Sequence, residues 1–453
     1  MHSRSSILLA VLLLAIVPRI CRAQATENTD GLAAFAALFQ QHDHPAILSP
    51  AISLDEAERI ALASNPQIEV AVRRVAVAEA HVPVAGALED PMTMYRGWGV
   101  PLEKPWDFNS AQNMFSLSQA LPGPGKRALR TGIAESDADV AKAQLAMVRL
   151  EIQVEVRKAF NDLLLADEEM RIHDEHMGIG RQAIEAARIK YSVGKVSQQD
   201  ILKAQVALSR VAEQMIRADQ DVGMARARLN TLLGRDAAAV LSVRGELTAL
   251  SVLPTIKSLE DAALRSRPDL DEARRASERS HKEQALAKKN GLPDFTVSAG
   301  YMLMPAGSNI RNNYMVEGEM SLPWLNRRKH DEEVGEAAAA ATAQDAELAA
   351  QRNSAFGEIQ LALVEAQSSQ RLAVFYTDQL RPQAEATLQS SVIAYENGKT
   401  DFLDLLDSQM TVIDIDLSWL QAMGDFNTRL ADLELATGAP IDQAQPSASE
   451  VKP

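Results

Sequence analysis

Residues 395–409 read YENGKTDFLDLLDSQ, and a related stretch, YSVGKVSQQDILKAQ, occupies residues 191–205. The two stretches share six of fifteen residues at a constant offset of 204 positions: a tyrosine, a glycine, a lysine, an aspartate, a leucine and a final glutamine. Such a match indicates an internal repeat, which has to be recognised before any single motif is interpreted. Three further pairs agree with it: SLDEAERIALASNP at 53–66 with SLEDAALRSRP at 258–268, LPGPGKR at 121–127 with LPWLNRRK at 322–329, and Leu229 and Gly234 with Leu433 and Gly438. The chain is therefore predicted to be a tandem duplication.

The duplication divides the chain into two repeats, 51–245 and 246–440. Long stripes of apolar residues recur at alternating steps of three and four, which is the spacing of helices that pack on other helices. In the first repeat the stripes are Leu145, Val148, Ile152, Val156, Ala159, Leu163, Ala166 and Met170, and Ile201, Ala204, Leu208, Val211, Met215, Ala218, Val222, Ala225, Leu229 and Leu232. We therefore expect long helical hairpins whose tips lie near residues 194 and 398.

The expected helix lengths also suggest how the helices are arranged. A helix over 126–193 would be about 100 Å long, and helices over 52–82 and 200–233 would each be about half as long. One long helix is thus expected to lie beside two shorter ones stacked end to end. Gly178 and Gly180 in the first repeat, and Pro382 in the second, are expected to bend the long helix.

Between the helices, four segments alternate apolar and polar residues, as a strand with two different faces does. They lie at 92–100, 113–121, 294–303 and 313–322. Segments of about ten residues with one apolar side are typical of strands that cross a membrane. Strands of a soluble sandwich are the alternative, although that fold usually has many more strands. Four strands cannot close a transmembrane barrel, since the smallest has about eight and an open edge cannot face lipid. Three copies would supply twelve strands, so we predict a homotrimer.

The first 25 residues, MHSRSSILLAVLLLAIVPRICRAQA, have the basic start, apolar run and small residues of a secretory signal. A leader is expected at 26–50 and a flexible tail at 441–453. The only cysteine, Cys21, lies in the signal, so no disulfide is expected, and Pro18-Arg19-Ile20 before it does not suit lipidation. A net charge of -15 argues against a nucleic-acid partner. The low aromatic content, 4%, suits long helices better than one large core.

Taken together, these motifs resemble the TolC-like outer membrane efflux family. The resemblance rests on SLDEAERIALASNPQIEVA at 53–71, on LPGPGKR after a strand, on the two tyrosine-to-glutamine stretches, and on RLNTLLG and ADLELATG near the repeat ends. SLSQALPGPGKR is most similar to the heavy-metal branch of the Czc and Cus type. The resemblance implies a mainly α fold with a small β part, in which tandem-duplicated helical hairpins form a periplasmic α-barrel. It also implies that four strands per chain contribute to a trimeric 12-stranded transmembrane β-barrel.

The same resemblance implies a passive export duct in the cell outer membrane with a large periplasmic extension. Its partners would be a periplasmic adaptor protein, an inner-membrane transporter of the resistance-nodulation-division class, and outer membrane lipid. The tip turns at Gly194-Lys195 and Gly398-Lys399 would close the duct. Asp404 and Asp407 match a ring of inner-helix aspartates that forms the gate. Tyr395 and Thr400 match one side of a latch and Asp200 the other, although a basic residue can occupy the position of Thr400.

Other interpretations of the tip residues have to be weighed against this one. NGKT is not a phosphate-binding loop, because that motif requires a glycine where this chain has Ile393. Gly398 is expected to end a helix. Asp404 and Asp407, spaced i, i+3, share one helix face that could simply be solvated. In a trimer they would instead bring six carboxylates around one axis and attract cations, and we favour this interpretation.

Candidate metal ligands are sparse. His173 and His176, in HDEH, have a spacing that two ligands on one helix face can have, but a solvated helix surface is the preferred interpretation. His42 and His44 lie on the leader, where adventitious binding is the simplest expectation. The strand segments also carry methionines that could form a path for soft metals, although apolar packing or lipid contact is preferred. These methionines are Met92, Met94, Met302 and Met304.

The sequence therefore predicts a non-enzymatic efflux duct without a cofactor, and heavy-metal cations as its cargo. No combination of nucleophile and base, and no set of three metal ligands, emerges from the chain. One alternative is an elongated periplasmic adaptor or scaffold built from coiled-coil hairpins. Another is an efflux duct for drugs or other small molecules. The four strand patterns favour a duct over an adaptor.

Overall fold

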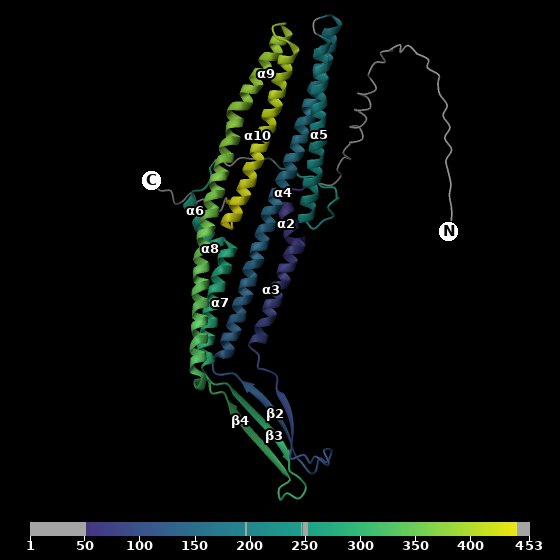
Figure 1. The fold of residues 1–453 in the computed structure, drawn as a ribbon. Coiled ribbons are helices and arrows are strands. Elements are labelled where there is room, and N and C mark those ends of the chain that lie inside the picture. The colour runs from purple at the N-terminus through teal and green to yellow at the C-terminus, as the bar shows by residue number, and fades with distance from the viewer. Residues whose placement is uncertain (1–50, 195–196, 246, 248–251, 442–453) are drawn as a thin grey trace, which may run out of the picture. The chain divides into compact units, whose positions relative to one another are not determined.

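The computed structural model describes residues 51–194, 197–245, 247 and 252–441. The expected signal, the leader and all but the first residue of the expected tail lie outside these residues, as do Lys195, His42 and His44. The described helices and strands belong to one compact unit, Ser49–Pro453. This unit is mainly helical and contains one small sheet (Figure 1).

The two repeats contain the same sequence of elements. The first has helices α2 (Leu54–Ser64), α3 (Pro66–Ala85), α4 (Lys126–Ser192) and α5 (Gln198–Leu232). The second has α6 (Ile256–Ser266), α7 (Pro268–Asn290), α8 (Arg327–Phe375), α9 (Arg381–Glu396) and α10 (Phe402–Thr437), with short turns η1 (Pro323–Asn326) and η2 (Tyr376–Leu380) on either side of α8. Helix α4 packs against α3 and α5, and α8 packs against α7 and α10. The expected arrangement of one long column beside two shorter helices is confirmed.

The two short helices at the start of each repeat are separated by a break at a proline, which is the first residue of the second helix. The single helix expected over 52–82 is wrong, because α2 ends at Ser64 and α3 begins at Pro66. The side chain of Asn65 caps α3 and also donates to the backbone oxygen of Leu232 at the end of α5. In the second repeat, Arg267 precedes Pro268 and donates to the backbone oxygen of Ala436 near the end of α10. The break thus ties the first helices of each repeat to its last helix.

The long helices differ in whether they are interrupted. Helix α4 is continuous through Gly178 and Gly180, so these glycines do not interrupt it. In the second repeat, η2 is a single π-helical turn that ends two residues before Pro382. A proline inside a helix cannot donate its backbone nitrogen and clashes with the carbonyl four residues earlier, and a π-turn absorbs this conflict. The position expected from Pro382 is therefore the one at which the helix changes.

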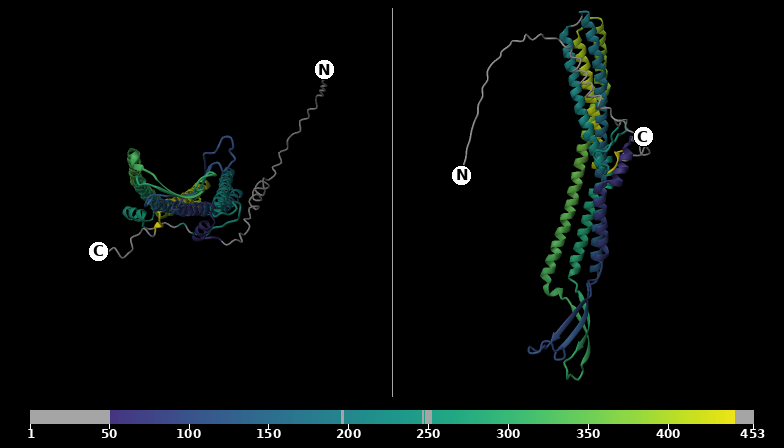
Figure 2. Two further views of the ribbon diagram at one scale, coloured as in Figure 1. Left: turned by 90° about the horizontal axis from the view of Figure 1, so that it is seen from below. Right: turned by 90° about the vertical axis from the view of Figure 1, so that its right-hand side faces the viewer.

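The sheet has the order β1-β2-β3-β4 and is antiparallel throughout. Its strands are β1 (Met92–Trp98), β2 (Gln112–Leu121), β3 (Phe295–Leu303) and β4 (Asn312–Met320). All four expected strand segments are thereby confirmed. The sheet lies at one end of the long helices, and the α4–α5 and α9–α10 turns lie at the other (Figure 1 and Figure 2).

The two faces of the sheet differ in chemistry. On the apolar face one row across the four strands is aromatic and consists of Tyr95, Phe115, Tyr301 and Tyr314. The next row contains Leu117 and Val316. The polar face carries Ser116, Ser298 and Glu317. The register also places Met92, Met94 and Met302 on the polar face. Alternation along each strand turns these methionines away from the face that carries the aromatic row.

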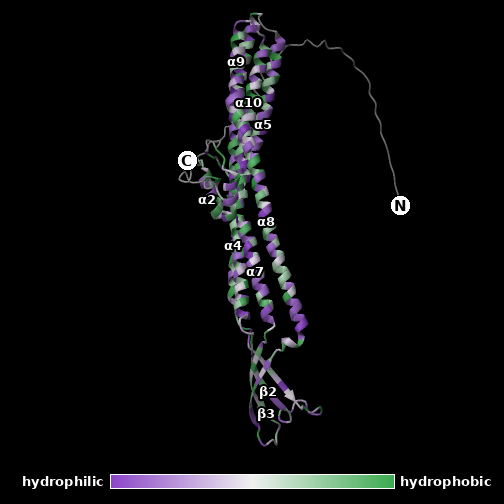
Figure 3. Cartoon of the chain, turned by 90° about the vertical axis from the view of Figure 1, so that its left-hand side faces the viewer, coloured by the Kyte–Doolittle hydropathy of each residue, from purple (hydrophilic) through white to green (hydrophobic). Residues whose placement is uncertain are grey.

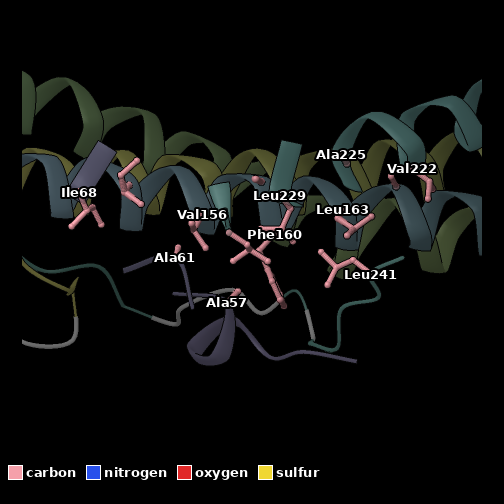
Figure 4. Packing of buried hydrophobic residues seen from close by; sticks show 14 residues of the cluster. Ala57, Ala61, Ile68, Val156, Phe160, Leu163, Val222, Ala225, Leu229 and Leu241 are labelled. Atoms are coloured by element: carbon pink, nitrogen blue, oxygen red, sulfur yellow. The ribbon is translucent and has the colours of Figure 1, made fainter. Parts of the chain in front are cut away.

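Buried apolar residues gather where the helices of each repeat meet. In the first repeat Val156, Phe160 and Leu163 of α4 pack with Leu229 of α5 and Ala57 of α2 (Figure 4). In the second repeat an equivalent cluster contains Leu259, Ile359 and Leu433. Small alanines between these large side chains let the helices approach closely. The helical stripes expected from the sequence are thus the packing surfaces of the fold.

Hydrophilic and hydrophobic residues are mixed along the whole length of the helices (Figure 3). In the part of the chain that the structure describes, no helix combines the length and hydrophobicity required to cross a membrane.

Candidate closing site at the helical turns

Both tip turns use a glycine in the left-handed region. Gly194 follows α4 with φ +75°, and Gly398 follows α9 with φ +71°. In each turn the glycine nitrogen donates to the backbone oxygen of the tyrosine three residues earlier, Tyr191 or Tyr395. Space is open around both glycines, so their backbone angle, and not a close contact, requires glycine here. The repeated Tyr-x-x-Gly pattern is therefore a helix-ending turn, as expected.

The helices that follow the turns begin with side-chain caps. Ser197 caps α5, and Asp200 completes a capping box by accepting hydrogen bonds from the backbone nitrogen and the hydroxyl of Ser197. Asp401 caps α10 by accepting from the backbone nitrogen of Asp404. Capping supplies partners for helix-end amides that would otherwise be unsatisfied. One aspartate in each tip motif thus has a structural role within its own chain.

The two hairpins are joined by packing around Tyr395. Its ring lies 5.7 Å from the ring of Phe402, and both belong to a buried cluster with Ile184 and Ala204. Lys190 of α4 places its Nζ 3.4 Å from the centre of the Tyr395 ring, which is a cation–π contact. We did not predict Lys190 or Phe402 from the sequence. Lys190 lies one residue before the repeated stretch, and Phe402 is the apolar residue that follows a cap.

The latch residues do not form one bonded group within the chain. The Tyr395 hydroxyl is buried and has no hydrogen-bond partner in the described ranges, and its ring is 9% exposed. Burial, with a further contribution from the charge of Asp200, raises the pKa of Tyr395. Asp200 itself bonds to Ser197, while the Thr400 hydroxyl donates to Asp404. A Tyr395–Asp200 hydrogen bond is therefore absent between these two described residues, although they interact electrostatically.

The predicted gate aspartates share one face at the start of α10. Asp404 and Asp407 are both exposed. Neither carboxylate has an ion-pair partner within residues 51–194, 197–245, 247 and 252–441. Lys399 on the preceding turn is also exposed. In a single chain this face is exposed to solvent, and Asp404 accepts a hydrogen bond from the Thr400 hydroxyl.

The histidine pair lies elsewhere, on buried positions of α4, and His176 meets α10. His173 is 1% exposed and His176 is 8% exposed, so the solvated surface preferred from the sequence is wrong. Nδ1 of His176 lies 3.1 Å from the amide nitrogen of Gln409, and Nε2 of His176 lies 3.9 Å from Asp416. Burial lowers the pKa of His176. The structure explains the difference, because the two acids between the histidines are exposed while both histidines are buried. No three His, Cys, Asp or Glu side chains in the described residues are grouped to hold a metal ion.

Comparison with known proteins identifies the family to which this fold and these turns belong. The family model for outer membrane efflux proteins matches residues 59–235 and 259–439, which include both tip turns. The chain belongs to the outer membrane efflux protein family. The two matched ranges correspond closely to the two repeats of this efflux protein.

Individual relatives of the efflux protein have more than one kind of name. The cobalt-zinc-cadmium resistance protein CzcC of Cupriavidus metallidurans is 26% identical over 300 residues, which cover 66% of this chain and 71% of CzcC. Nodulation protein T of Rhizobium leguminosarum bv. trifolii is 23% identical over 397 residues, which cover 83% of this chain and 84% of that protein. The solved structure of CusC, a protein that forms a transmembrane channel, has a TM-score of 0.72 at 16% identity and covers 85% of this chain and 92% of that chain. At this identity the similarity to CusC establishes the fold.

Proposed function

We propose that three copies of this efflux protein form a passive duct through the outer membrane. The observation that carries the proposal is the two-faced sheet. Its apolar face leaves Tyr314 91% exposed and Val316 81% exposed. Soluble proteins rarely leave such an apolar surface uncovered. Lipid is a suitable environment for this face, with an aromatic row where the membrane meets water.

The two outer edges of the sheet support three copies. Within the described residues, β1 pairs only with β2 and β4 only with β3, so one edge of each outer strand is unpaired. An unpaired edge cannot remain in lipid, because its backbone groups would have no hydrogen-bond partners. Pairing β4 of one copy with β1 of the next satisfies both edges, and three copies give a closed sheet of twelve strands. The long helices would then line a channel that continues into the periplasm.

The tip turns would close this channel at its far end. We assign Asp404 and Asp407 to a gate ring, since both are exposed on one helix face near the turn. The buried Tyr395 hydroxyl, with Thr400 and Asp200, is assigned to a latch between neighbouring turns. An adaptor protein and an inner-membrane pump of the resistance-nodulation-division class would deliver cargo to this end. The duct itself performs no chemistry.

Heavy-metal cations are the proposed cargo. The similarity to CzcC, which is named for cobalt, zinc and cadmium resistance, supports this choice. Nodulation protein T is a relative whose name refers to no metal, so a duct for drugs or other small molecules is the second candidate. The two cargoes would be distinguished by comparing cells that lack the protein with the same cells after the protein has been restored. Restored resistance to cobalt, zinc or cadmium is expected for the metal duct, and unchanged metal sensitivity would favour the organic cargo.

The trimer is tested by fractionation of cells that produce the full-length protein. We expect it in the outer membrane and, in detergent without boiling, as a band of three chains that boiling converts to one. The trimer should resist mild denaturation because its strands pair between copies. A monomer in the periplasmic fraction would overturn the duct and favour the adaptor or scaffold alternative.

The orientation of the sheet is tested by a pair of substitutions at neighbouring positions of β4. Val316→Arg should reduce the outer-membrane trimer severely, because an arginine facing the lipid midplane costs about 2–4 kcal/mol per chain. Glu317→Arg, on the polar face, should leave trimer yield close to that of the parent protein. Yield is measured as the heat-modifiable band in the membrane fraction. Equal yields from the two variants would contradict the assignment of the apolar face to lipid.

A further inference from the structure

Four methionines, one from each strand, gather on the polar face of the sheet. Strands β2 and β3 contribute the two that lie directly opposite each other, and β1 and β4 contribute two in the adjoining row. The group, called the methionine group below, consists of Met94, Met114, Met302 and Met315. The sheet also offers a matched control residue, because Met320 pairs with Phe295 on the apolar face.

Cross-strand geometry brings each methionine of the group within reach of its neighbour on the adjoining strand. Met114 and Met302 are register partners, and such pairs have Cβ atoms about 4.5–5.5 Å apart. Met94 is diagonal to Met114, and Met315 is diagonal to Met302, at about 7–8 Å. A methionine side chain is long and unbranched, so it spans these separations.

A glycine in the adjoining row makes room for one of the thioethers. Gly300 lies between Ser116 and Met315 in the register. A Cβ at Gly300 would lie 3.3 Å from Cε of Met315 and 2.8 Å from the backbone oxygen of Phe115. Met315 therefore leans across the glycine toward β2. Met114 and Met315 line a cavity of about 510 Å³ on this face.

The chemistry of the group selects the ligand. Thioether sulfur is a soft, neutral donor that prefers Cu(I) over the harder divalent metals. Among the described residues no cluster of His, Cys, Asp or Glu offers a competing site for borderline metals. We propose that the methionine group is a docking site for a soft monovalent cation, Cu(I) or Ag(I), on the inner wall of the duct. This inference rests on the proposed duct, because it takes the polar face as the wall of the channel.

The surroundings of the group favour weak binding. Arg96 and Gln112 donate to the sulfur atoms of Met94 and Met302, and a cation has to displace these contacts. Arg96 also places a positive charge on the wall of the cavity, opposed there by Glu317. A conduit requires sites that bind its cargo weakly enough to release it. The group thus suits transient contact with a passing ion and not storage.

The test measures Cu(I) binding to the purified full-length protein under anaerobic conditions, by competition with a colorimetric Cu(I) chelator. One variant replaces all four methionines of the group with leucine, which keeps their volume and removes the sulfur. The control is Met320→Leu. We expect the fourfold variant to bind at least about tenfold more weakly than the parent, and the control to bind as the parent does. Copper X-ray absorption of the parent should show sulfur ligands that the fourfold variant lacks.

The outcomes separate this inference from the proposed function. Equal Cu(I) affinity in parent and fourfold variant, or no Cu(I) binding by the parent, would overturn the methionine site. Equal weakening by Met320→Leu would also overturn it, because the effect would not belong to the polar face. Conductance in planar bilayers is measured on the same preparations. If the trimers conduct but the fourfold variant binds Cu(I) as the parent does, the proposed duct stands and the methionine site falls. If the parent protein forms neither trimers nor channels, the proposed duct itself is overturned.

Discussion

Replacing Arg157 with methionine is expected to destabilise the protein by about 3–5 kcal/mol, because two buried carboxylates lose their cation. Arg157 on α4 bonds to Glu58 of α2, with Nε 2.6 Å from Oε1, and to Glu434 of α10. The three side chains are only 23%, 12% and 13% exposed. Methionine would roughly preserve the packing of the arginine stem. The loss of stability therefore measures the contribution of the charge that holds three helices from both repeats together.

The destabilisation by Arg157→Met should depend on pH. Burial raises the pKa of Glu434 above its ordinary value even with Arg157 present, and removing the arginine should raise it further. An acid whose pKa is higher in the folded protein contributes most stability below its unfolded pKa, and this contribution is lost as pH rises through the folded pKa. The difference in stability between variant and parent should thus be smaller near pH 5 than near pH 7.5.

The measurement is unfolding by denaturant, followed by the circular dichroism of the helices in detergent. Arg228→Met is the matched control, since Arg228 also bonds to two acids, Glu155 and Asp162, but all three side chains are at least 40% exposed. Exposed pairs contribute less than about 1 kcal/mol. Similar losses from the two variants, or a larger loss at low pH for Arg157→Met, would contradict the buried-charge explanation.

Replacing Asp404 and Asp407 together with alanine is expected to abolish block of the channel by trivalent cations. If three chains meet at the tip, these residues place six carboxylates around one axis, and a trivalent ion bridges several of them at once. Removing the carboxylates removes the bridging site. The measurement is single-channel current in planar bilayers with a trivalent ion added on the side of the helical turns.

A control on the same helix separates the tip from the rest of α10. Asp414 is exposed and lies seven residues, or about 10 Å, beyond Asp407. Asp414→Ala should leave block unchanged, and both variants should assemble as trimers, because the α10 cap at Asp401 is retained. Unchanged block in the double variant would remove Asp404 and Asp407 from the constriction. Loss of block in Asp414→Ala alone would place the constriction deeper in the channel.

Much of the fold could be predicted from local pattern. Apolar residues at steps of three and four predicted the long helices, and alternation predicted all four strands, since each pattern follows from the period of one backbone geometry. The matching Gly194 and Gly398 predicted two turns, and the structure gives both glycines a positive φ. The Asn65–Pro66 break was missed, because apolar periodicity continues across it. The repeat comparison set Ser258 beside Ser53, whereas Thr255 is the residue that caps α6 as Ser53 caps α2.

The candidate site could be predicted only in part. The turns and exposed aspartates were found because they lie within one repeated stretch. The Lys190–Tyr395 contact joins residues 205 positions apart, and no local spacing signals it. The buried histidines were misjudged for a similar reason. Their acidic neighbours suggested solvent, but the helices that pack against α4 decide which of its residues are buried.

The sequence by itself thus determined the duplication, the helix and strand types and the chemistry of each strand face, because these depend on residues near one another in the chain. Only the tertiary structure decided which distant groups meet. It joined Arg157 to Glu58 and Glu434, 99 and 277 residues away. It also set the strand register that places Met114 opposite Met302. The physical reason is that long-range neighbours follow from the packing of whole helices and strands, and a shift of one residue in register would exchange the faces.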